Sequence, residues 1–251
     1  MDLRDKVALI TGGASGIGRA TALALAEAGA VIVIADVNEP DGRAVAEHVG
    51  GHFVAVDVSD LQSNRDMVDQ ATEAAGGVDL AFLNAGVSSG CGIGDDFDLE
   101  LYRRAMGVNL DGVVFGAHAV LPALRARGGG AIVATASLAG LTGMPLDIIY
   151  GANKHAVVGF VRSLAPAVEG EGIRVNGVCP GFAESGITKG LEEGIASFGV
   201  PIMPASEVAV VVRDLFQGDM AGECWFVQPG RTGAFEFRRV PGPRLQHEES
   251  A

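Results

Sequence analysis

The chain has 251 residues, a formal net charge of −13 at pH 7, and a hydrophobic content of 48%. This length suits one large α/β domain. Its 37 glycines and its aromatic share of only 6% indicate a core of small and branched side chains, as in buried parallel sheets. The negative charge argues against nucleic acid or an anionic membrane surface as the main partner, because both require basic patches.

Cysteine and histidine usage gives no sign of a disulfide framework or a metal site. Cys91, Cys179 and Cys224 are odd in number and widely spaced, so we expect buried thiols in a reducing compartment. The five histidines lack metal-ligand spacing, and we predict no bound metal. The first six residues lead directly into an apolar strand, unlike a signal peptide, and no run is typical of a membrane span. We therefore expect a cytoplasmic protein.

Short apolar runs that end in Gly, Asp or Asn alternate with helical patterns along the chain. Such runs are typical of parallel strands buried on both faces. We expect strands at 7–10, 31–35, 53–56, 80–83, 131–135, 174–178 and 224–227. Helices are expected at 19–28, 41–48, 63–75, 99–127 with a break near Gly107, 150–165 and 206–216. The alternation predicts an α/β fold with a doubly wound, parallel, seven-stranded sheet flanked by helices on both faces.

No linker-like tract divides the chain, so we expect a single domain over residues 1–230. Residues 231–251 contain two prolines, several charges and no periodicity, which predicts an extended or partly disordered tail that lies on a neighbouring subunit. The segment 182–204 has a composition typical of a mobile loop. Pro166 should kink or end the helix in which it lies, because proline lacks the backbone donor.

A glycine-rich segment, Gly12-x-x-x-Gly16-x-Gly18, lies between the first strand and the first helix. Glycines allow the backbone to approach a pyrophosphate, and a helix N-terminus offers free N–H groups. The segment, with Ser15 and Ile17, therefore predicts a nucleotide-binding loop; a tight structural turn is the alternative.

Asp36 follows Gly18 by 18 residues and ends the second strand. A carboxylate at this position accepts hydrogen bonds from a ribose diol and repels a 2′-phosphate. Neighbouring Val37 and Ser15 supply no cation for such a phosphate. We therefore predict NAD rather than NADP, the alternative being a solvated carboxylate after a strand.

Tyr150 and Lys154 are four residues apart, so on a helix they project from the same face. An ammonium beside a phenol favours the phenolate and lowers a pKa that is ordinarily about 10. Tyr150 is then a candidate proton donor and acceptor. A Tyr-x-x-x-Lys pair is a weak signal by itself and depends on the motifs upstream.

Those motifs, in this order and spacing, resemble the short-chain dehydrogenase/reductase family over about residues 5–230. Besides the glycine-rich segment and the Tyr-x-x-x-Lys pair, they are Asp57-Val58, Asn84-Ala85-Gly86, Asn109, Ser137 and Pro180-Gly181. The resemblance implies a Rossmann fold, a nicotinamide cofactor, and a homo-dimer or homo-tetramer. The chain departs from the family pattern at Leu83, where Asn is common, and at Ser185, where Thr is common.

The resemblance also implies roles for individual residues. Tyr150 would be the acid/base, Ser137 would orient the substrate oxygen, and Lys154 would lower the Tyr150 pKa and hold the nicotinamide ribose. Asn109, at the expected helix break, would fix a water that relays protons to Lys154. The remaining cofactor contacts would come from Asp57 and Val58 at the adenine, from Asn84, Ala85 and Gly86 beside the ribose, and from Pro180, Gly181, Ala183 and Ser185 at the nicotinamide.

The segments expected to line the substrate pocket are mostly apolar, and Lys189 is the one cation among them. They are Leu138-Ala139, 144–146, 88–97 and 182–204. This composition favours a small, mainly hydrophobic secondary alcohol or ketone. We therefore predict an NAD-dependent oxidoreductase that interconverts such a pair; the alternatives are an NADP-dependent carbonyl reductase and a non-catalytic nucleotide-binding sensor or scaffold, which would not need both Tyr150 and Lys154.

Overall fold

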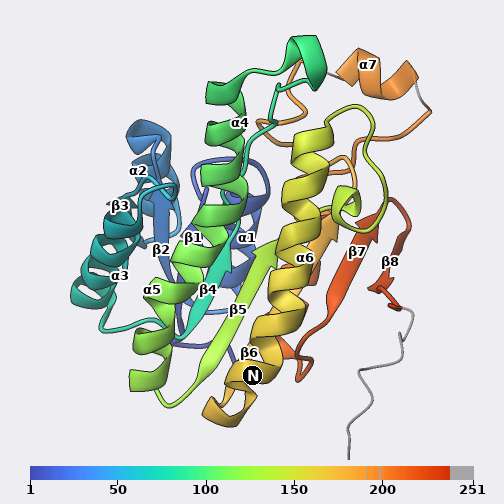
Figure 1. Cartoon of the computed structure of the whole chain (residues 1–251). Coiled ribbons are helices and arrows are strands. Elements are labelled where there is room, and N and C mark those ends of the chain that lie inside the picture. Colours follow the sequence, from blue (N-terminus) through green and yellow to red (C-terminus); the bar gives the residue numbers. More distant parts are fainter. Residues whose placement is uncertain (191, 198, 238–251) are drawn as a thin grey trace, which may run out of the picture.

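The computed structural model describes residues 1–190, 192–197 and 199–237, and its centre is one sheet (Figure 1). The sheet has eight strands in the order β3-β2-β1-β4-β5-β6-β7-β8. They are β1 (Val7–Thr11), β2 (Val31–Asp36), β3 (His52–Ala55), β4 (Leu80–Leu83), β5 (Gly130–Thr135), β6 (Ile173–Pro180), β7 (Cys224–Gln228) and β8 (Arg231–Ala234). The first seven pair in parallel, which confirms the predicted doubly wound sheet, and β8 pairs antiparallel with β7. The predicted count of seven is therefore one strand short.

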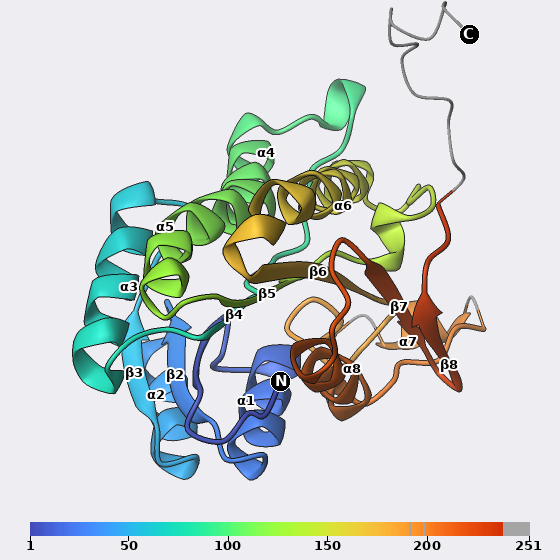
Figure 2. The same cartoon turned by 90° about the horizontal axis from the view of Figure 1, so that it is seen from below.

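Helices cover both faces of the sheet, as expected (Figure 2). One face carries α1 (Gly16–Glu27), α2 (Glu39–His48) and α8 (Ala205–Gln217). The other carries α3 (Leu61–Ala75), α4 (Leu99–Met106), α5 (Gly112–Ala126) and α6 (Ile148–Val168). Side chains of Asn38, Asp60, Asp98 and Asp147 cap the N-termini of α2, α3, α4 and α6 by accepting backbone N–H bonds.

Alternate residues of each central strand enter the two halves of the core. In β1, Val7 and Leu9 belong to the cluster beneath α3, α5 and α6, whereas Ala8 and Ile10 belong to the cluster beneath α1 and α8. All five residues of β1 are buried. A strand covered on both faces must be apolar throughout, which is why these runs were readable from the sequence.

The helix expected to break near Gly107 does not break. Residues Gly107–Asp111 form a π-helical segment, η2, that joins α4 to α5, so the chain is helical over Leu99–Ala126. Length and composition alone would allow this helix to cross a membrane, but such helices also occur in protein cores. Val113, Ala117, Val120 and Leu124 are buried in the core of this fold.

Two expectations near the C-terminus also need correction. α6 continues past Pro166 to Val168, so of the two expected effects, a kink or an end of the helix, the end does not occur. Residues 231–234, expected in an extended tail, form β8, and the ring of Phe237 lies 3.9 Å from the guanidinium carbon of Arg162 on α6. The remainder of the expected tail, residues 238–251, lies outside the described residues.

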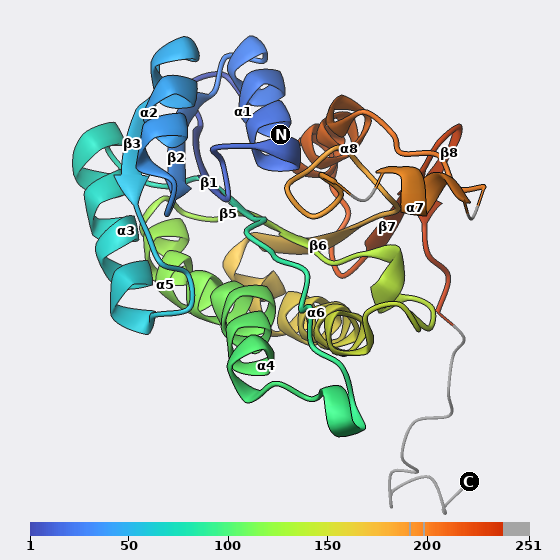
Figure 3. The ribbon, with the colours of Figure 1, turned by 90° about the horizontal axis from the view of Figure 1, so that it is seen from above.

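The segment 182–204, expected to be a mobile loop, has local structure. It contains the short helix α7 (Glu192–Ser197) and a bridge between Ala183 and Met203. It lies above the carboxyl ends of the strands, where Figure 3 looks down on it.

At the amino ends of the strands, directly before β4, Asp79 connects three parts of the chain. Its carboxylate accepts the Val7 N–H at 2.9 Å and two bonds from the Arg127 guanidinium at 3.0 and 3.1 Å, and it lies 3.5 Å from the Lys6 ammonium. Burial raises the pKa of this carboxyl, but the Arg127 and Val7 hydrogen bonds and the two positive charges hold the pKa below its ordinary value. Asp79 thus secures the start of β1 next to β4.

We expect Asp79→Asn to lower the free energy of unfolding at neutral pH by about 1–3 kcal/mol, because a buried ionic hydrogen-bond partner is lost. A group whose pKa is depressed in the folded state stabilises above its unfolded pKa, so the difference should shrink as the pH falls below about 4. Urea unfolding at several pH values measures it. Glu171→Gln, which breaks the exposed pair with Arg125, is the matched control and should cost much less. Equal losses in the two variants would contradict this role for Asp79.

Candidate active site

A cavity of about 1110 Å³ lies at the carboxyl edge of the sheet, above the point where the strand order reverses between β1 and β4. Ligands of doubly wound folds bind at this position. The cavity brings together 17 of the predicted residues. They are Gly12, Ser15, Gly16, Ile17, Asp36, Asp57, Val58, Asn84, Ala85, Gly86, Ser137, Tyr150, Lys154, Pro180, Gly181, Ala183 and Ser185. Gly18 and Asn109 do not line it, and both are buried behind its wall.

The glycine-rich loop has the geometry that a phosphate cradle requires. Gly12 and Gly16 have φ angles of +66° and +50°, a region that favours glycine. A Cβ on Gly18 would lie 2.1 Å from the Gly12 carbonyl oxygen. Ser15, at the N-cap of α1, makes no side-chain capping bond, so the first N–H groups of α1 are available to an anion. The loop therefore fits the pyrophosphate of a dinucleotide.

Asp36 ends β2 beside this loop and is held in place by two backbone donors. Its carboxylate accepts the Ala14 N–H at 3.0 Å and the Asn38 N–H at 2.9 Å. Each oxygen retains a lone pair for a further donor, such as a ribose hydroxyl. Val37, next to it, is 73% exposed and apolar.

Asn84 joins the ends of three strands beneath the cavity. Its side-chain amide donates to the carbonyls of Thr11 at 3.1 Å and Gly12 at 3.3 Å, and its oxygen accepts the Thr135 hydroxyl at 3.1 Å. The side chain therefore fixes the glycine-rich loop relative to β4 and β5.

Lys154 is buried, with 1% of its surface exposed, although its side chain carries a charge. Its ammonium donates to the Thr135 carbonyl at 2.7 Å. Desolvation lowers the pKa of this ammonium to about 8. The position that a Cβ of Gly86 would take lies 3.3 Å from the Asn109 Oδ1, a tight approach, and 3.7 Å from the Lys154 Nζ, an ordinary contact.

Asn109 lies in the π-helical segment, and its side chain hydrogen-bonds to the backbone of Val87, which follows β4. Its Oδ1 accepts the Val87 N–H at 2.8 Å, and its Nδ2 donates to the Val87 carbonyl at 2.9 Å and to the Asn153 Oδ1 at 3.2 Å. The side chain is thus committed to positioning the chain after β4.

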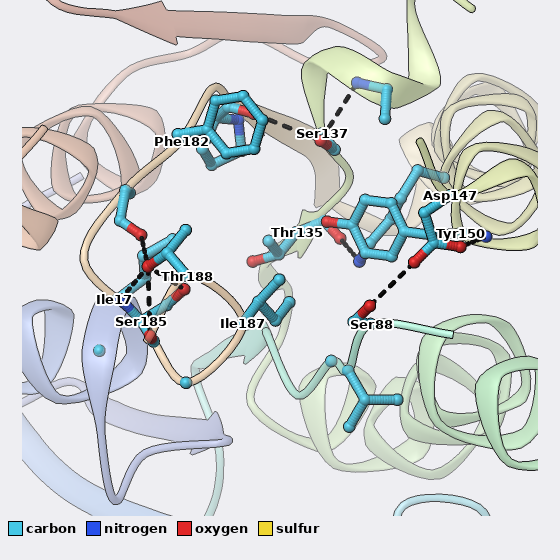
Figure 4. Close-up of a pocket in the computed structure, with 18 of the residues that line it drawn as sticks. Ile17, Ser88, Thr135, Ser137, Asp147, Tyr150, Phe182, Ser185, Ile187 and Thr188 are labelled. Carbon is cyan, nitrogen blue, oxygen red and sulfur yellow. Dashed lines mark hydrogen bonds between the residues drawn. The ribbon is translucent and has the colours of Figure 1, made fainter. Parts of the chain in front are cut away.

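Tyr150 faces the cavity, with the centre of its ring 5.5 Å from the Lys154 ammonium (Figure 4). The expectation of a lowered pKa is wrong for the protein chain alone. Burial raises the pKa of Tyr150 to about 12; a hydrogen bond with Ser137 acts in the opposite direction, and the charges of Asp147 and Cys179 add to the rise. In the protein chain alone, the Tyr150 phenol is therefore a proton donor. A positive charge other than that of Lys154 would be needed to lower its pKa below the ordinary value.

Ser137 follows β5 and points into the same space as Tyr150. Its Oγ accepts the Ala139 N–H at 3.1 Å and donates to the Pro180 carbonyl at 3.4 Å. These contacts fix the hydroxyl between the ends of β5 and β6. A carbonyl or hydroxyl oxygen placed between Ser137 and Tyr150 would meet two hydrogen-bonding groups.

Two residues that the sequence reading missed organise this site. The Thr188 hydroxyl accepts the Ser185 N–H at 3.1 Å and donates to the Ala183 carbonyl at 2.8 Å, which shapes the segment after Gly181. Asp147, three residues before Tyr150, caps α6. A short polar residue directly before a helix was a readable N-cap signal, whereas nothing in the sequence singled out Thr188.

The end of the cavity near Tyr150 has a mainly apolar wall, as predicted. Lys189, the cation expected there, is not among the described lining residues, and the cavity is instead lined by Arg104 on α4. The apolar residues of this wall are Leu138, Ala139, Met144, Leu146, Phe182, Ile187, Ile195, Val200 and Pro201.

Comparisons with known proteins agree with this geometry. The family model for short chain dehydrogenases matches residues 6–196. Cyclohexanol dehydrogenase of Acinetobacter sp. (strain SE19) is 36% identical over 84% of this chain and 88% of its own length. Cis-4-hydroxycyclohexanecarboxylate dehydrogenase of Sinomonas cyclohexanicum is 36% identical over 82% of this chain and 84% of its own.

Among solved structures, levodione reductase superposes with a TM-score of 0.83 at 31% identity, covering 90% of this chain and 97% of its own. A short-chain type dehydrogenase/reductase from Mycobacterium marinum gives a TM-score of 0.85 at 32% identity, covering 91% and 96%.

We expect Gly18→Ala to weaken dinucleotide binding at least about tenfold, because the added Cβ displaces the Gly12 carbonyl and distorts the cradle. Gly159→Ala is the matched control. Gly159 is an exposed glycine within α6 with nothing within 4 Å of the added Cβ, so this change should leave binding intact. It should also stabilise the fold by about 0.5–1 kcal/mol. Calorimetric titration with NADH and thermal unfolding measure both effects; unchanged NADH binding by Gly18→Ala would contradict the cradle.

Proposed function

The chain belongs to the short-chain dehydrogenase family, and from this premise we propose that it is an NAD-dependent oxidoreductase that interconverts a secondary alcohol and a ketone. One observation carries the proposal. A single cavity places a phosphate cradle at one end, and Ser137, Tyr150 and Lys154 beside an apolar wall at the other. Such a cavity suits a dinucleotide together with a small, mainly hydrophobic substrate.

In the proposed mechanism, Ser137 and Tyr150 hold the reacting oxygen between their hydroxyl groups. In reduction, Tyr150 gives its proton to the carbonyl oxygen; in oxidation, the phenolate takes the proton of the alcohol. Lys154, when protonated, places a positive charge 5.5 Å from the Tyr150 ring, and this charge opposes the rise in the Tyr150 pKa that burial causes. A bound nicotinamide cofactor supplies the hydride acceptor or donor.

Asp36 supports NAD as the cofactor of this reaction. Its carboxylate is fixed at the end of β2 and would repel a 2′-phosphate, while its neighbours Val37 and Ser15 offer no positive charge to one. An NADP-dependent reductase would need a cation at this position. A non-catalytic sensor, the remaining alternative, would not need Lys154 buried beside Tyr150 at the cost of desolvation.

We further propose a ring-shaped substrate, a cyclic secondary alcohol of about six ring atoms. Several relatives are named for such compounds: cyclohexanol, 4-hydroxycyclohexanecarboxylate and 2,5-dichloro-2,5-cyclohexadiene-1,4-diol. The apolar wall of the cavity suits a saturated ring of this kind.

The purified protein should reduce NAD with a cyclic secondary alcohol from a panel that also contains linear alcohols and sugars. Tyr150→Phe should lower kcat at least about 100-fold, because the proton acceptor is lost, and should leave NADH binding within about twofold. Absorbance of the reduced nicotinamide and calorimetric titration measure the two quantities. Normal turnover by Tyr150→Phe would show that the proposed acid/base is wrong.

The wild-type protein should bind NADH more tightly than NADPH by at least about tenfold, because Asp36 repels the extra phosphate. Asp36→Asn should narrow this ratio by removing the charge while keeping a hydrogen-bond acceptor. Competitive titration with the two reduced cofactors gives the ratio directly. Tighter binding of NADPH by the wild-type protein would favour the NADP-dependent alternative.

A further inference from the structure

The carboxylate of Asp147 connects the catalytic helix to a loop that lines the substrate end of the cavity. It lies at the N-cap of α6, where Oδ1 accepts the Tyr150 N–H at 3.0 Å. On its other side, Oδ2 accepts the Ser88 hydroxyl at 2.9 Å and the Ser89 N–H at 2.9 Å. The Ser89 hydroxyl donates to Oδ1. Figure 4 shows the Ser88–Asp147 bond beside the ring of Tyr150.

The loop in question, residues 87–91, follows β4 and forms part of the cavity wall through Val87, Ser88, Gly90 and Cys91. Asn109 holds its start through both backbone groups of Val87. Its middle is held by Asp147, and the Ser89 hydroxyl also accepts the Cys91 N–H at 3.1 Å. The middle of this wall is therefore held relative to Tyr150 by one carboxylate, that of Asp147.

We propose that Asp147 is a positioning residue that fixes the loop of residues 87–91 to the first turn of α6 and so sets the distance between the substrate-facing wall and Tyr150. The inference rests on the proposed function, because it assigns Asp147 to the same site. A catalytic role is excluded by hydrogen-bond capacity. A carboxylate has about four acceptor positions, and Asp147 receives four donors, so its oxygens are not open to a substrate hydroxyl.

The same carboxylate acts on Tyr150 through its charge. The groups that shift the pKa of Tyr150, besides burial, are Ser137 after β5, Asp147 on α6 and Cys179 on β6, and the ammonium of Lys154 lies 5.5 Å from its ring. Burial raises the pKa most, the Ser137 hydrogen bond lowers it, and the negative charge of Asp147 raises it further. Removal of that charge should allow the phenolate to form at lower pH.

Asp147→Asn removes the charge and leaves one acceptor oxygen where there were two, so donors of the loop lose an acceptor while the helix cap survives. We expect the KM for the cyclic alcohol to rise about tenfold, because the wall shifts, while the Kd for NADH stays within about twofold. The acid limb of the pH profile of alcohol oxidation should move to lower pH.

Two further variants distinguish the effect of Asp147 on the position of the loop from the effect of its charge on the pKa of Tyr150. Ser89→Ala removes one bond to the loop but keeps the carboxylate, so it should raise KM and leave the pH profile unchanged. Asp60→Asn alters a comparable N-cap, at α3, which does not line the cavity, and it should change neither quantity. If Asp147→Asn does not fold, an unchanged KM in Ser89→Ala still overturns the proposal. An Asp147→Asn protein with the KM and pH profile of the wild type overturns it as well.

Hydrogen exchange distinguishes failure of this inference from failure of the proposed function. If no alcohol is oxidised by the wild-type protein, the proposed function fails, but the loop can still be examined. The Ser89 amide, which donates to Asp147, should exchange faster in Asp147→Asn than in Asp60→Asn. Equal exchange in the two variants would overturn the loop attachment.

Discussion

Burial of the Lys154 ammonium is the constraint on which the rest of the site depends. A buried cation is costly unless hydrogen bonds compensate it, and among the described residues no carboxylate forms an ion pair with it. The fold compensates with the carbonyl of Thr135. Such an arrangement stabilises negative charge nearby, in the phenolate of Tyr150 or in a bound ligand, more than it stabilises the protein alone.

The strand order explains why one cavity contains both the dinucleotide-binding residues and the residues beside the reacting oxygen. Parallel strands bring their carboxyl ends to one edge, and the reversal between β1 and β4 opens a crevice there. The glycine-rich loop after β1 and Asp36 after β2 lie on one side of the reversal, and Ser137 after β5 lies on the other. Asn84, after β4, hydrogen-bonds to both sides and keeps them in register.

Much of this arrangement was predictable because local patterns determine it. Apolar runs located the seven parallel strands, and glycines at positive φ marked the phosphate loop. The expected break near Gly107 is a π-helical turn at Gly107–Asp111, and β8 forms a hairpin with β7 across Pro229-Gly230, a local turn signal that the prediction did not use. Two other features that were missed depend on burial or on contacts distant in sequence. The pKa of Tyr150 depends on burial, which spacing to Lys154 does not reveal. The bond that attaches the loop to Asp147 joins residues 59 positions apart, Ser88 and Asp147.

In the proposed reaction, a hydride moves in this cavity between the carbinol carbon of a cyclic alcohol and a nicotinamide, while Tyr150 gives or takes the proton. The most direct measurement is mass spectrometry of the cofactor after turnover of cyclohexanol that carries deuterium on its carbinol carbon. Direct hydride transfer predicts one deuterium in each molecule of reduced cofactor. Reduced cofactor without deuterium, or none formed with any cyclic secondary alcohol, would contradict it.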